Sequence, residues 1–257
     1  RGYTVLVDHT FADRAQEAMA ANGLRPHLID GLILDPQALR ADDLLPTVGS
    51  IPTVLLGERL MGRPRDHVAI DNVGAARTIV NHLVHIGRRR IAVIGMQEPS
   101  IATCGAPDMR LQGYAEALSA AGIPQDPQLI ECAYHWGRPS GERAMRNLLA
   151  LPDPPDAVFC FNDLMALGAM HAVKTAGLRV PEDVAVAGFD DIEDGQYANP
   201  ALTTIAPDKQ GIADTAVRLL LARIDGTRTG PFELIVPAFK LVVRESTAGS
   251  SALSPGP

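Results

Sequence analysis

The sequence predicts an α/β protein with parallel sheets in two lobes, and three observations carry this prediction. Short apolar runs alternate with amphipathic helical segments along nearly the whole chain. Several of the helical segments end at a glycine. The apolar runs fall into two sets, separated by a connector over residues 61–71 that is rich in Arg, Gly and Pro. A repeated strand, helix, strand order implies right-handed crossovers and parallel strands.

The first set of elements begins with an apolar run at residues 5–7, which predicts a strand. A helix is expected over residues 13–22 because Gly23 can end it. Two further strands are expected over residues 31–34 and 53–56, and Pro52 introduces the second of them.

The second set follows the same alternation. Helices are expected over residues 74–86, 110–121, 141–149 and 164–176. Strands are expected over residues 91–94, from residue 129 onward, and over residues 157–161 and 184–187. A late helix over residues 211–225 and a late strand over residues 233–236 indicate that the chain returns to the first lobe.

Composition restricts the class of protein. A chain of 257 residues with 46% hydrophobic content can form one large or two medium cores. A formal net charge of −7 argues against nucleic-acid binding by this chain itself, since phosphate contacts need a clustered positive face. The one basic run, residues 88–90, follows a predicted helix end, where cations complement the helix dipole.

Three further features bear on the compartment and on the chain end. Three widely spaced cysteines without a Cys-x-x-Cys pair favour a reduced, cytoplasmic setting. No apolar run is long enough to cross a membrane, and the first residues do not form a signal peptide. The segment from Thr247 onward has little apolar surface, so we expect frayed ends and a fold that stops near Ser246.

The most informative segment is residues 180–191, Val-Pro-Glu-Asp-Val-Ala-Val-Ala-Gly-Phe-Asp-Asp. Its apolar run is typical of a buried parallel strand that stops at Gly188. Asp190 and Asp191 then follow the carboxyl end of the strand, where open parallel sheets bind their ligands. Carboxylates held there can accept hydrogen bonds from hydroxyl groups. The alternative is that the acidic pair only starts a turn.

Several motifs in order resemble one family. They are His82–Gly95, Arg110-Leu-Gln-Gly-Tyr, Pro155–Gly168 with its Phe-Asn-Asp, the segment above with Leu202-Thr-Thr-Ile, and Arg244-Glu-Ser. Together they resemble, in order and spacing, the ligand-binding core of the lactose-repressor (LacI/GalR) family. The resemblance implies a type I periplasmic-binding-protein fold, in which two Rossmann-like lobes joined by three crossovers hold an effector in their cleft.

The family resemblance also implies how the chain is divided. The N-terminal lobe would hold residues 1–70 and 207–235, the C-terminal lobe residues 71–206 and 236–247, and residues 248–257 a disordered tail. It implies a homodimeric regulator that binds operator DNA through a helix-turn-helix headpiece absent from this chain. The family's first strand and first helix would precede Arg1, so that the chain starts at the second strand of the first lobe.

Four residues are candidate effector contacts. Arg110 matches the family's effector-contacting arginine, and its planar guanidinium can bind two hydroxyls or a carboxylate. The alternative is a solvated residue in the first turn of a helix. Asp190 matches the family's effector carboxylate, with Asp191 as the second choice. Asn162 matches the family's asparagine and offers both a donor and an acceptor, although it could instead cap the next helix. We assign Asp163 to capping or to bonding within its own lobe.

Trp136, the only tryptophan, is the fourth candidate because an aromatic ring can cover the apolar face of a pyranose. Packing is the alternative role. Gly57 and Pro207 stand where family members can carry polar effector contacts, so the effector is expected to be smaller or less hydroxylated than a disaccharide. The loop of residues 96–108, which contains Cys104, could add contacts of its own.

The sequence therefore predicts the effector-binding core of a cytoplasmic transcriptional regulator that senses a small sugar-like metabolite. A periplasmic sugar-binding receptor of an ABC transporter is the alternative. Catalysis is not expected, because Gly-x-Gly-x-x-Gly, phosphate-loop and nucleophile-elbow motifs are missing. No cofactor or metal is predicted; His82 and His85 lie three residues apart on one predicted helix, but surface or packing roles suit them better.

Overall fold

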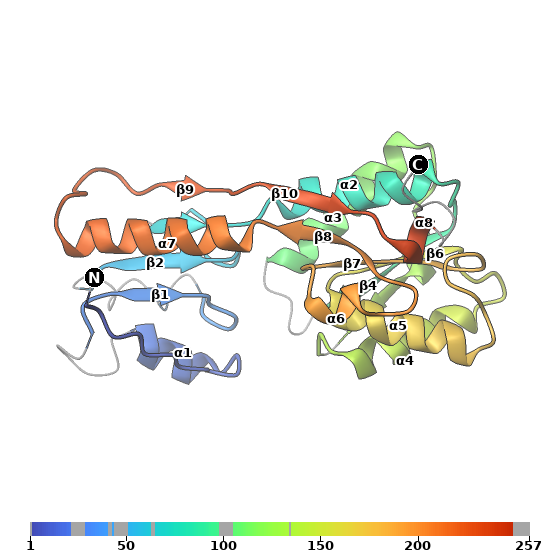
Figure 1. The fold of residues 1–257 in the computed structure, drawn as a ribbon, viewed down its shortest axis with the longest axis horizontal. Coiled ribbons are helices and arrows are strands. Elements are labelled where there is room, and N and C mark those ends of the chain that lie inside the picture. Colours follow the sequence, from blue (N-terminus) through green and yellow to red (C-terminus); the bar gives the residue numbers. More distant parts are fainter. Residues whose placement is uncertain are drawn as a thin grey trace, which may run out of the picture. The chain divides into compact units, whose positions relative to one another are not determined.

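The computed structural model describes residues 2–21, 29–40, 43, 51–62, 65–97, 105–133 and 135–248. The chain divides into two compact units, which are treated separately below (Figure 1). Unit 1 comprises Arg1–Ile70 and Lys209–Pro237, and unit 2 comprises Asp71–Asp208 and Ala238–Pro257. Each unit contains a sheet of parallel strands with helices packed against it, so the predicted α/β class is confirmed.

Unit 1 has a four-stranded parallel sheet with helices on both faces. Its strands, in spatial order, are β1 (Leu32–Leu34), β2 (Thr53–Leu56), β3 (Asp66–Val68) and β9 (Leu234–Ile235). Val54 packs with Leu219 of α7 (Lys209–Ile224), whereas Leu55 packs with Ala21 of α1 (Arg14–Ala21). Successive residues of a strand point to opposite faces, which explains why neighbouring residues serve two different cores.

Strand β3 was missed by the sequence analysis, which treated residues 61–71 as a connector. The first residue of the strand, Asp66, is fully buried and polar, so the segment does not form an apolar run. Its carboxylate accepts hydrogen bonds from Arg223 Nε of α7 at 2.7 Å and from the Glu233 amide at 3.0 Å. A strand whose buried polar residues are paired by other elements gives no periodic signal.

Unit 2 has a six-stranded sheet. Its strands, in spatial order, are β10 (Phe239–Val242), β8 (Thr203–Pro207), β7 (Ala185–Phe189), β6 (Ala157–Cys160), β4 (Ile91–Met96) and β5 (Ile130–Cys132). All neighbours are parallel except β10, which runs antiparallel to β8. The short helices α6 (Glu193–Gln196) and α8 (Glu245–Ala248) complete the unit.

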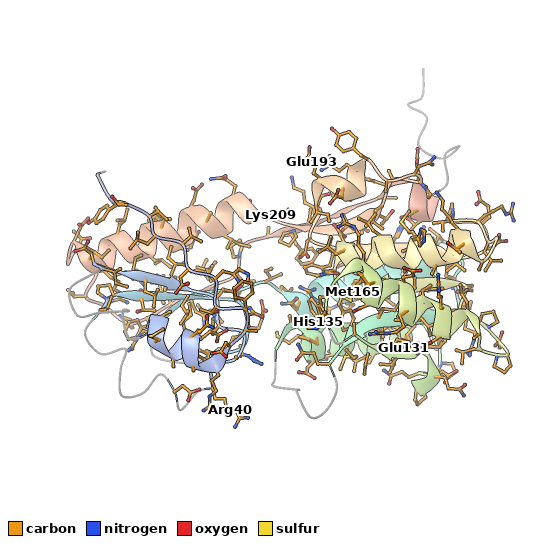
Figure 2. The ribbon with its side chains drawn as sticks, turned by 90° about the horizontal axis from the view of Figure 1, so that it is seen from below. Arg40, Glu131, His135, Met165, Glu193 and Lys209 are labelled. Atoms are coloured by element: carbon orange, nitrogen blue, oxygen red, sulfur yellow. The ribbon has the colours of Figure 1, made fainter. Side chains whose placement is uncertain are left out.

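The longer helices of unit 2 pack in pairs. Helix α2 (Asn72–His85) contacts α3 (Ala106–Ala120), and α4 (Arg138–Leu149) contacts α5 (Asp163–Thr175). Glycine allows the second pair to approach closely. A Cβ atom at Gly168 would overlap the carbonyl oxygen of Arg138, and one at Gly141 would overlap that of Met165. Figure 2 labels Met165 in the first turn of α5.

Three expectations from the sequence are wrong in detail. Residues 5–7 are not a strand: Val5 is 82% and Val7 91% exposed, and none of the described strands pairs with them. An apolar run needs a hydrogen-bonded neighbour to become a strand. The helix expected from Arg110 begins four residues earlier, at Ala106, because Gly105 and Pro107 start it. Thr247 is not frayed but buried in α8.

Two expectations concern the ends of the fold and the membrane. Residues 249–257, most of the expected disordered tail, lie outside the described residues. Within the described part of the chain, none of the helices has the length and apolar character that a membrane span requires.

Candidate functional site

The acidic pair lies at the carboxyl end of β7, directly after Phe189. Both residues have positive φ angles, +112° for Asp190 and +51° for Asp191, although neither is glycine. The Asp190 amide donates to the carbonyl of Ile205 at 2.9 Å, which continues the pairing of β7 with β8 beyond the strand. Consecutive non-glycine residues in this conformation are uncommon and often mark functional turns.

The two aspartates have different surroundings. Asp191 Oδ1 accepts a charge-assisted hydrogen bond from Arg244 Nη2 at 2.6 Å. The same arginine donates through Nη1 to the carbonyl of Leu202 at 2.8 Å, and its side chain is 17% exposed. The carboxylate of Asp191 is therefore used inside unit 2, and Asp190 stays the first choice for the effector carboxylate because it matches the family's residue.

Arg110 is buried within helix α3, with only 4% of its surface exposed. Its Nε donates to Asn72 Oδ1 at 2.6 Å, and its Nη1 donates to the carbonyl of Phe161 at the end of β6. The guanidinium lies 3.5 Å from the ring centroid of Phe189, the last residue of β7. The alternative of a solvated first-turn residue is wrong, because the helix begins before Arg110 and its side chain points into the unit.

Trp136 lies close to Arg110. Its ring centroid is 5.4 Å from the guanidinium carbon, a cation–π distance, and its Nε1 donates to the carbonyl of Gly95 at 3.1 Å. Gly95 lies near the carboxyl end of β4. The indole is therefore fixed at the same edge of the sheet as Arg110.

Asn162 is the N-cap of α5, the role that the sequence left as the alternative. Its Oδ1 accepts from the Met165 amide at 2.8 Å, and its Nδ2 donates to the carbonyl of Trp136 at 2.9 Å. A primary amide has two N–H groups and two acceptor lone pairs, so these bonds use half of its capacity. Effector contact by Asn162 stays a prediction, and the bond to Trp136 gives it a second role in holding the indole.

The four predicted residues thus come together at one edge of the unit 2 sheet. Asn162 is bonded to Trp136, Trp136 lies against Arg110, and Arg110 stacks on the residue before Asp190. They follow β5, β6 and β7 or lie in α3 beside them. Sequence reasoning gave no supporting role to Asn72, Phe189 or Arg244, although Phe189 and Arg244 stand in motifs that it quoted.

Asp163, next to Asn162, is fully buried and bonded within unit 2, as expected from the sequence. Its Oδ1 accepts from the Thr204 hydroxyl at 2.6 Å and its Oδ2 from the Ile192 amide at 2.9 Å. Burial raises the pKa of Asp163 to about 6; the two hydrogen bonds oppose this shift, and the nearby charges of Asp190 and Asp191 add to it.

This shift predicts a pH dependence of stability. The pKa of Asp163 lies above the ordinary 3.8, so the folded state keeps a proton that the unfolded state has released. The contribution is fully present below about pH 4 and is lost as pH rises through about 6. We expect the free energy of unfolding of the wild type, relative to Asp163→Asn, to fall by about 3 kcal/mol between pH 4 and pH 7. Urea unfolding of both proteins at several pH values measures this difference. A difference in the free energy of unfolding that does not change with pH would contradict the prediction.

Unit 1 offers one further polar group at the corresponding edge of its own sheet. Asp35 directly follows β1, and Gly57 directly follows β2 with a φ angle of +73°. A Cβ atom at Gly57 would lie 2.9 Å from Asp35 Oδ1, so the carboxylate occupies the space beside the glycine. Burial, followed by the charge of Glu58, raises the pKa of Asp35. The sequence analysis noted that Gly57 lacks a polar side chain but did not identify Asp35.

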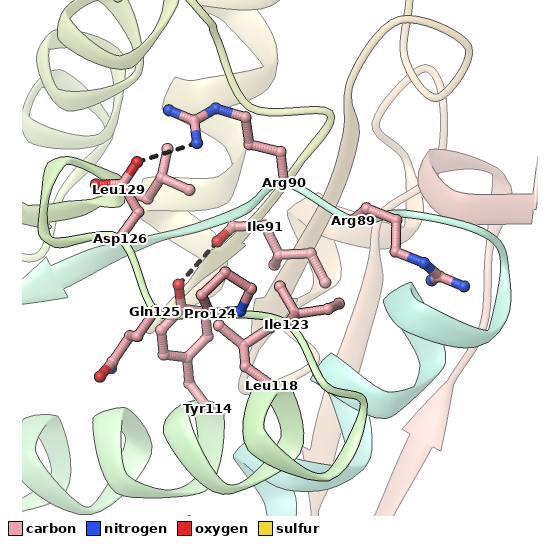
Figure 3. A pocket seen from close by; sticks show the side chains of 10 residues that line it. All are labelled: Arg89, Arg90, Ile91, Tyr114, Leu118, Ile123, Pro124, Gln125, Asp126 and Leu129. Carbon is pink, nitrogen blue, oxygen red and sulfur yellow. Dashed lines mark hydrogen bonds and ion pairs between the residues drawn. The ribbon is translucent and has the colours of Figure 1, made fainter.

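A cavity of about 340 Å³ lies elsewhere in unit 2, at the amino end of β4 (Figure 3). Three of its polar side chains have partners: Tyr114 Oη donates to the carbonyl of Ile91 at 2.9 Å, and Arg90 pairs with Asp126 at 3.0 Å. The predicted effector residues lie at the other end of the strands. The geometry therefore favours the carboxyl edge over this cavity as a ligand site.

His82 has a structural role. Its Nε2 lies 2.8 Å from Thr247 Oγ1, and burial, followed by the charge of His85, lowers its pKa. The part of the chain that the structure describes contains no group of three His, Cys, Asp or Glu side chains that could hold a metal ion.

Two parallel-sheet units, with polar side chains at the carboxyl edge of one sheet, define a periplasmic-binding-protein-like ligand-binding core. The family model for the periplasmic binding protein-like domain matches residues 80–247. The chain belongs to the LacI family of transcriptional regulators and is its ligand-binding core.

Two curated relatives illustrate the match. The transcriptional repressor CytR of Escherichia coli K12 is 36% identical over 249 residues, covering 96% of this chain and 71% of the relative. The transcriptional regulator CelR of Thermobifida fusca is 38% identical over 224 residues, covering 85% of this chain and 63% of the relative. Both are regulators of transcription, so the alternative of a transport receptor is not favoured.

Solved structures of similar proteins support the same family assignment. A structure described as a transcriptional regulator of the LacI family from Sanguibacter keddieii is 41% identical, with a TM-score of 0.85, and the match covers 95% of this chain and 87% of that one. A complex of the regulator CelR with cellobiose is 37% identical with a TM-score of 0.79, covering 91% of this chain and 71% of that one.

Proposed function

We propose that this chain senses a small sugar-like metabolite at the carboxyl edge of the unit 2 sheet and thereby regulates transcription. One observation carries the proposal: a buried arginine, Arg110, stacks on Phe189 and lies against Trp136, immediately beside the strand end that presents Asp190. A planar cationic donor, an aromatic face and a carboxylate suit a polyhydroxylated ring, whose hydroxyls both donate and accept while its C–H face is apolar.

The similarity to the CelR complex with cellobiose supports a carbohydrate effector. Gly57 and Pro207 add no polar side chain, which supports an effector smaller or less hydroxylated than a disaccharide. We infer no catalytic role, because the relatives are regulators.

We further propose that the whole protein is a cytoplasmic homodimer that binds operator DNA through a separate headpiece. The net charge of −7 of this chain supports a separate DNA-binding element. Effector binding would change the arrangement of the two units, and the size of that response is limited by the difference in effector affinity between the two arrangements.

The test is a thermal-shift and calorimetric screen of the purified chain against D-glucose, D-ribose, cellobiose, glycerol, cytidine and glucose 6-phosphate. We expect at least one sugar to stabilise the wild type. Asp190→Ala should weaken its binding about 10- to 100-fold, because a charge-assisted hydrogen bond contributes roughly 1.5–3 kcal/mol.

The matched control is Asp153→Ala. Asp153 is an exposed aspartate of the same unit, in the turn before β6, and thus at the amino edge of the sheet. The Asp153→Ala variant should bind the stabilising sugar as tightly as the wild type does. Equal binding by Asp190→Ala would remove Asp190 from the site, and a screen without any stabilising sugar would reject the effector class.

A further inference from the structure

The turn of residues 190–192 adopts a conformation that its own residues do not favour. Asp190 and Asp191 have φ angles of +112° and +51°, a region where an L-residue other than glycine costs of order 1–3 kcal/mol. Such a turn persists only where surrounding groups fix it. The surrounding groups therefore decide where the Asp190 carboxylate points.

Three side chains from separate elements bind this turn. Asp163, the first residue of α5, accepts from the Ile192 amide at 2.9 Å. Arg244, from the segment after β10, donates to the Asp191 carboxylate at 2.6 Å. Thr204 of β8 donates to Asp163 Oδ1 at 2.6 Å and also accepts from the Asp191 amide at 3.4 Å.

The strand itself leaves room for Asp163. A Cβ atom at Gly188 of β7 would overlap Asp163 Oδ1, so this carboxylate lies against the backbone of the strand that leads into the turn. Asp163 is fully buried. A buried carboxylate with two hydrogen bonds and no room to move is a rigid support.

Arg244 is also held firmly, because the residues after it are anchored to the same strands. Ser246 Oγ donates to the carbonyl of Val186 in β7 at 2.6 Å and accepts from the Thr203 amide of β8 at 2.8 Å. Glu245 Oε2 accepts from the Ala201 amide at 3.0 Å. All three residues of the Arg244-Glu-Ser motif therefore bond to β7, to β8 or to the turn and segment that join them.

The negative charges around the turn also affect how the effector can bind. Asp163, Asp190 and Asp191 are close enough for their charges to interact, and Arg244 is paired with Asp191. Without Arg244, two carboxylates of the turn would compete for the hydroxyls of one effector and repel each other.

We propose that Asp163 and Arg244 are positioning residues of the effector site, which hold the turn of residues 190–192 so that the Asp190 carboxylate, and not that of Asp191, meets the effector. The part that concerns the effector rests on the proposed function. The part that concerns the turn does not, and it is measurable without a ligand.

The first experiment is amide hydrogen exchange on the ligand-free chain. In Arg244→Gln and in Asp163→Asn, we expect the amides of Asp190 and Ile192 to exchange at least 10-fold faster, while the amides within β6 keep their wild-type rates. Thr204→Val removes a hydroxyl that donates to Asp163 and accepts from the Asp191 amide, so it should also speed the exchange of the turn amides, and it serves if Asp163→Asn does not fold. Unchanged exchange in Arg244→Gln and Thr204→Val would overturn the proposal.

The second experiment measures binding of cellobiose and D-glucose by calorimetry. Arg244→Gln should weaken binding about 10-fold in the wild-type background but less than 2-fold in Asp190→Ala, because both changes remove the same contact. A merely structural loss would weaken binding equally in both backgrounds, and that result would overturn the positioning role.

The control is Arg179→Gln, which removes another arginine–aspartate pair of unit 2. Arg179 lies 3.0 Å from Asp183, and both residues precede β7, whereas the turn follows that strand. It should change neither exchange nor binding. Faster exchange of the turn together with no sugar binding by the wild type would reject the proposed function while leaving the support of the turn established.

Discussion

Arg110→Ala is expected to reduce effector affinity at least 100-fold, the largest effect on binding that we predict. The guanidinium offers several donors in one plane and stacks on Phe189, so its loss removes charge-assisted hydrogen bonds and a stacked cation together, about 3 kcal/mol or more. The substitution should also destabilise unit 2 by about 1–3 kcal/mol, because Asn72 Oδ1, a buried acceptor, loses its donor.

Arg110→Lys separates these two effects. A lysine keeps the charge but cannot bond Asn72 and the Phe161 carbonyl in the same planar geometry, so we expect a folded protein with affinity reduced about 10-fold or more. Calorimetry with the stabilising sugar and thermal unfolding provide the two measurements.

The matched control is Arg77→Ala on α2. Arg77 forms an exposed ion pair with Glu116 of α3 at 3.0 Å. The Arg77→Ala substitution should therefore lower the free energy of unfolding by at most about 1 kcal/mol and leave effector affinity within 2-fold of the wild type. Wild-type affinity in a folded Arg110→Lys variant would exclude Arg110 from the effector site.

Asp66→Ala is expected to destabilise unit 1 by about 3–5 kcal/mol, the largest effect on stability that we predict. Asp66 is fully buried and pairs with Arg223, whose side chain is only 12% exposed. Removing one member of a buried pair leaves the other charge uncompensated. The Glu233 amide would also lose its acceptor, which weakens the pairing of β3 with β9.

The effect should be confined to unit 1 and should depend on pH. Burial alone would raise the pKa of Asp66, but the hydrogen bonds from Arg223 and Glu233 and the nearby positive charges outweigh it, so its pKa lies below the ordinary 3.8. Its stabilisation is therefore present above about pH 4 and is lost as the pH falls through the folded-state pKa.

Urea unfolding followed by two signals measures this confinement. Trp136 is the only tryptophan and lies in unit 2, so its fluorescence reports that unit, whereas far-ultraviolet circular dichroism reports both. In Asp66→Ala, the urea midpoint measured by circular dichroism should fall below its wild-type value. The midpoint measured by Trp136 fluorescence should stay close to its wild-type value. The control, Asp225→Ala, removes an exposed aspartate of the same unit. Indistinguishable curves for the two variants would refute the role of the buried pair.

The fold was predictable wherever apolar runs and helical periodicity carried the signal. Strand β2 and the helices α2 and α5 appear close to their expected bounds. The predictions for β3 and for residues 5–7 failed for the same reason: pairing between distant segments is not written in a local pattern. Strand β3 is stabilised by Arg223, which lies 157 positions later, and the apolar residues 5–7 find no neighbouring strand among the described residues.

The candidate site divides in the same way. The sequence by itself determined which residue types follow the strand of residues 184–187, and so placed Asp190 at a carboxyl edge; it also named Asn162 and Trp136 as candidate contacts. Only the tertiary structure decided their surroundings: that Arg110 is buried against Phe189, and that Arg244 pairs with Asp191. The physical reason is that a strand's end is fixed by local patterning, whereas a side chain's partner depends on elements that folding brings together from distant positions.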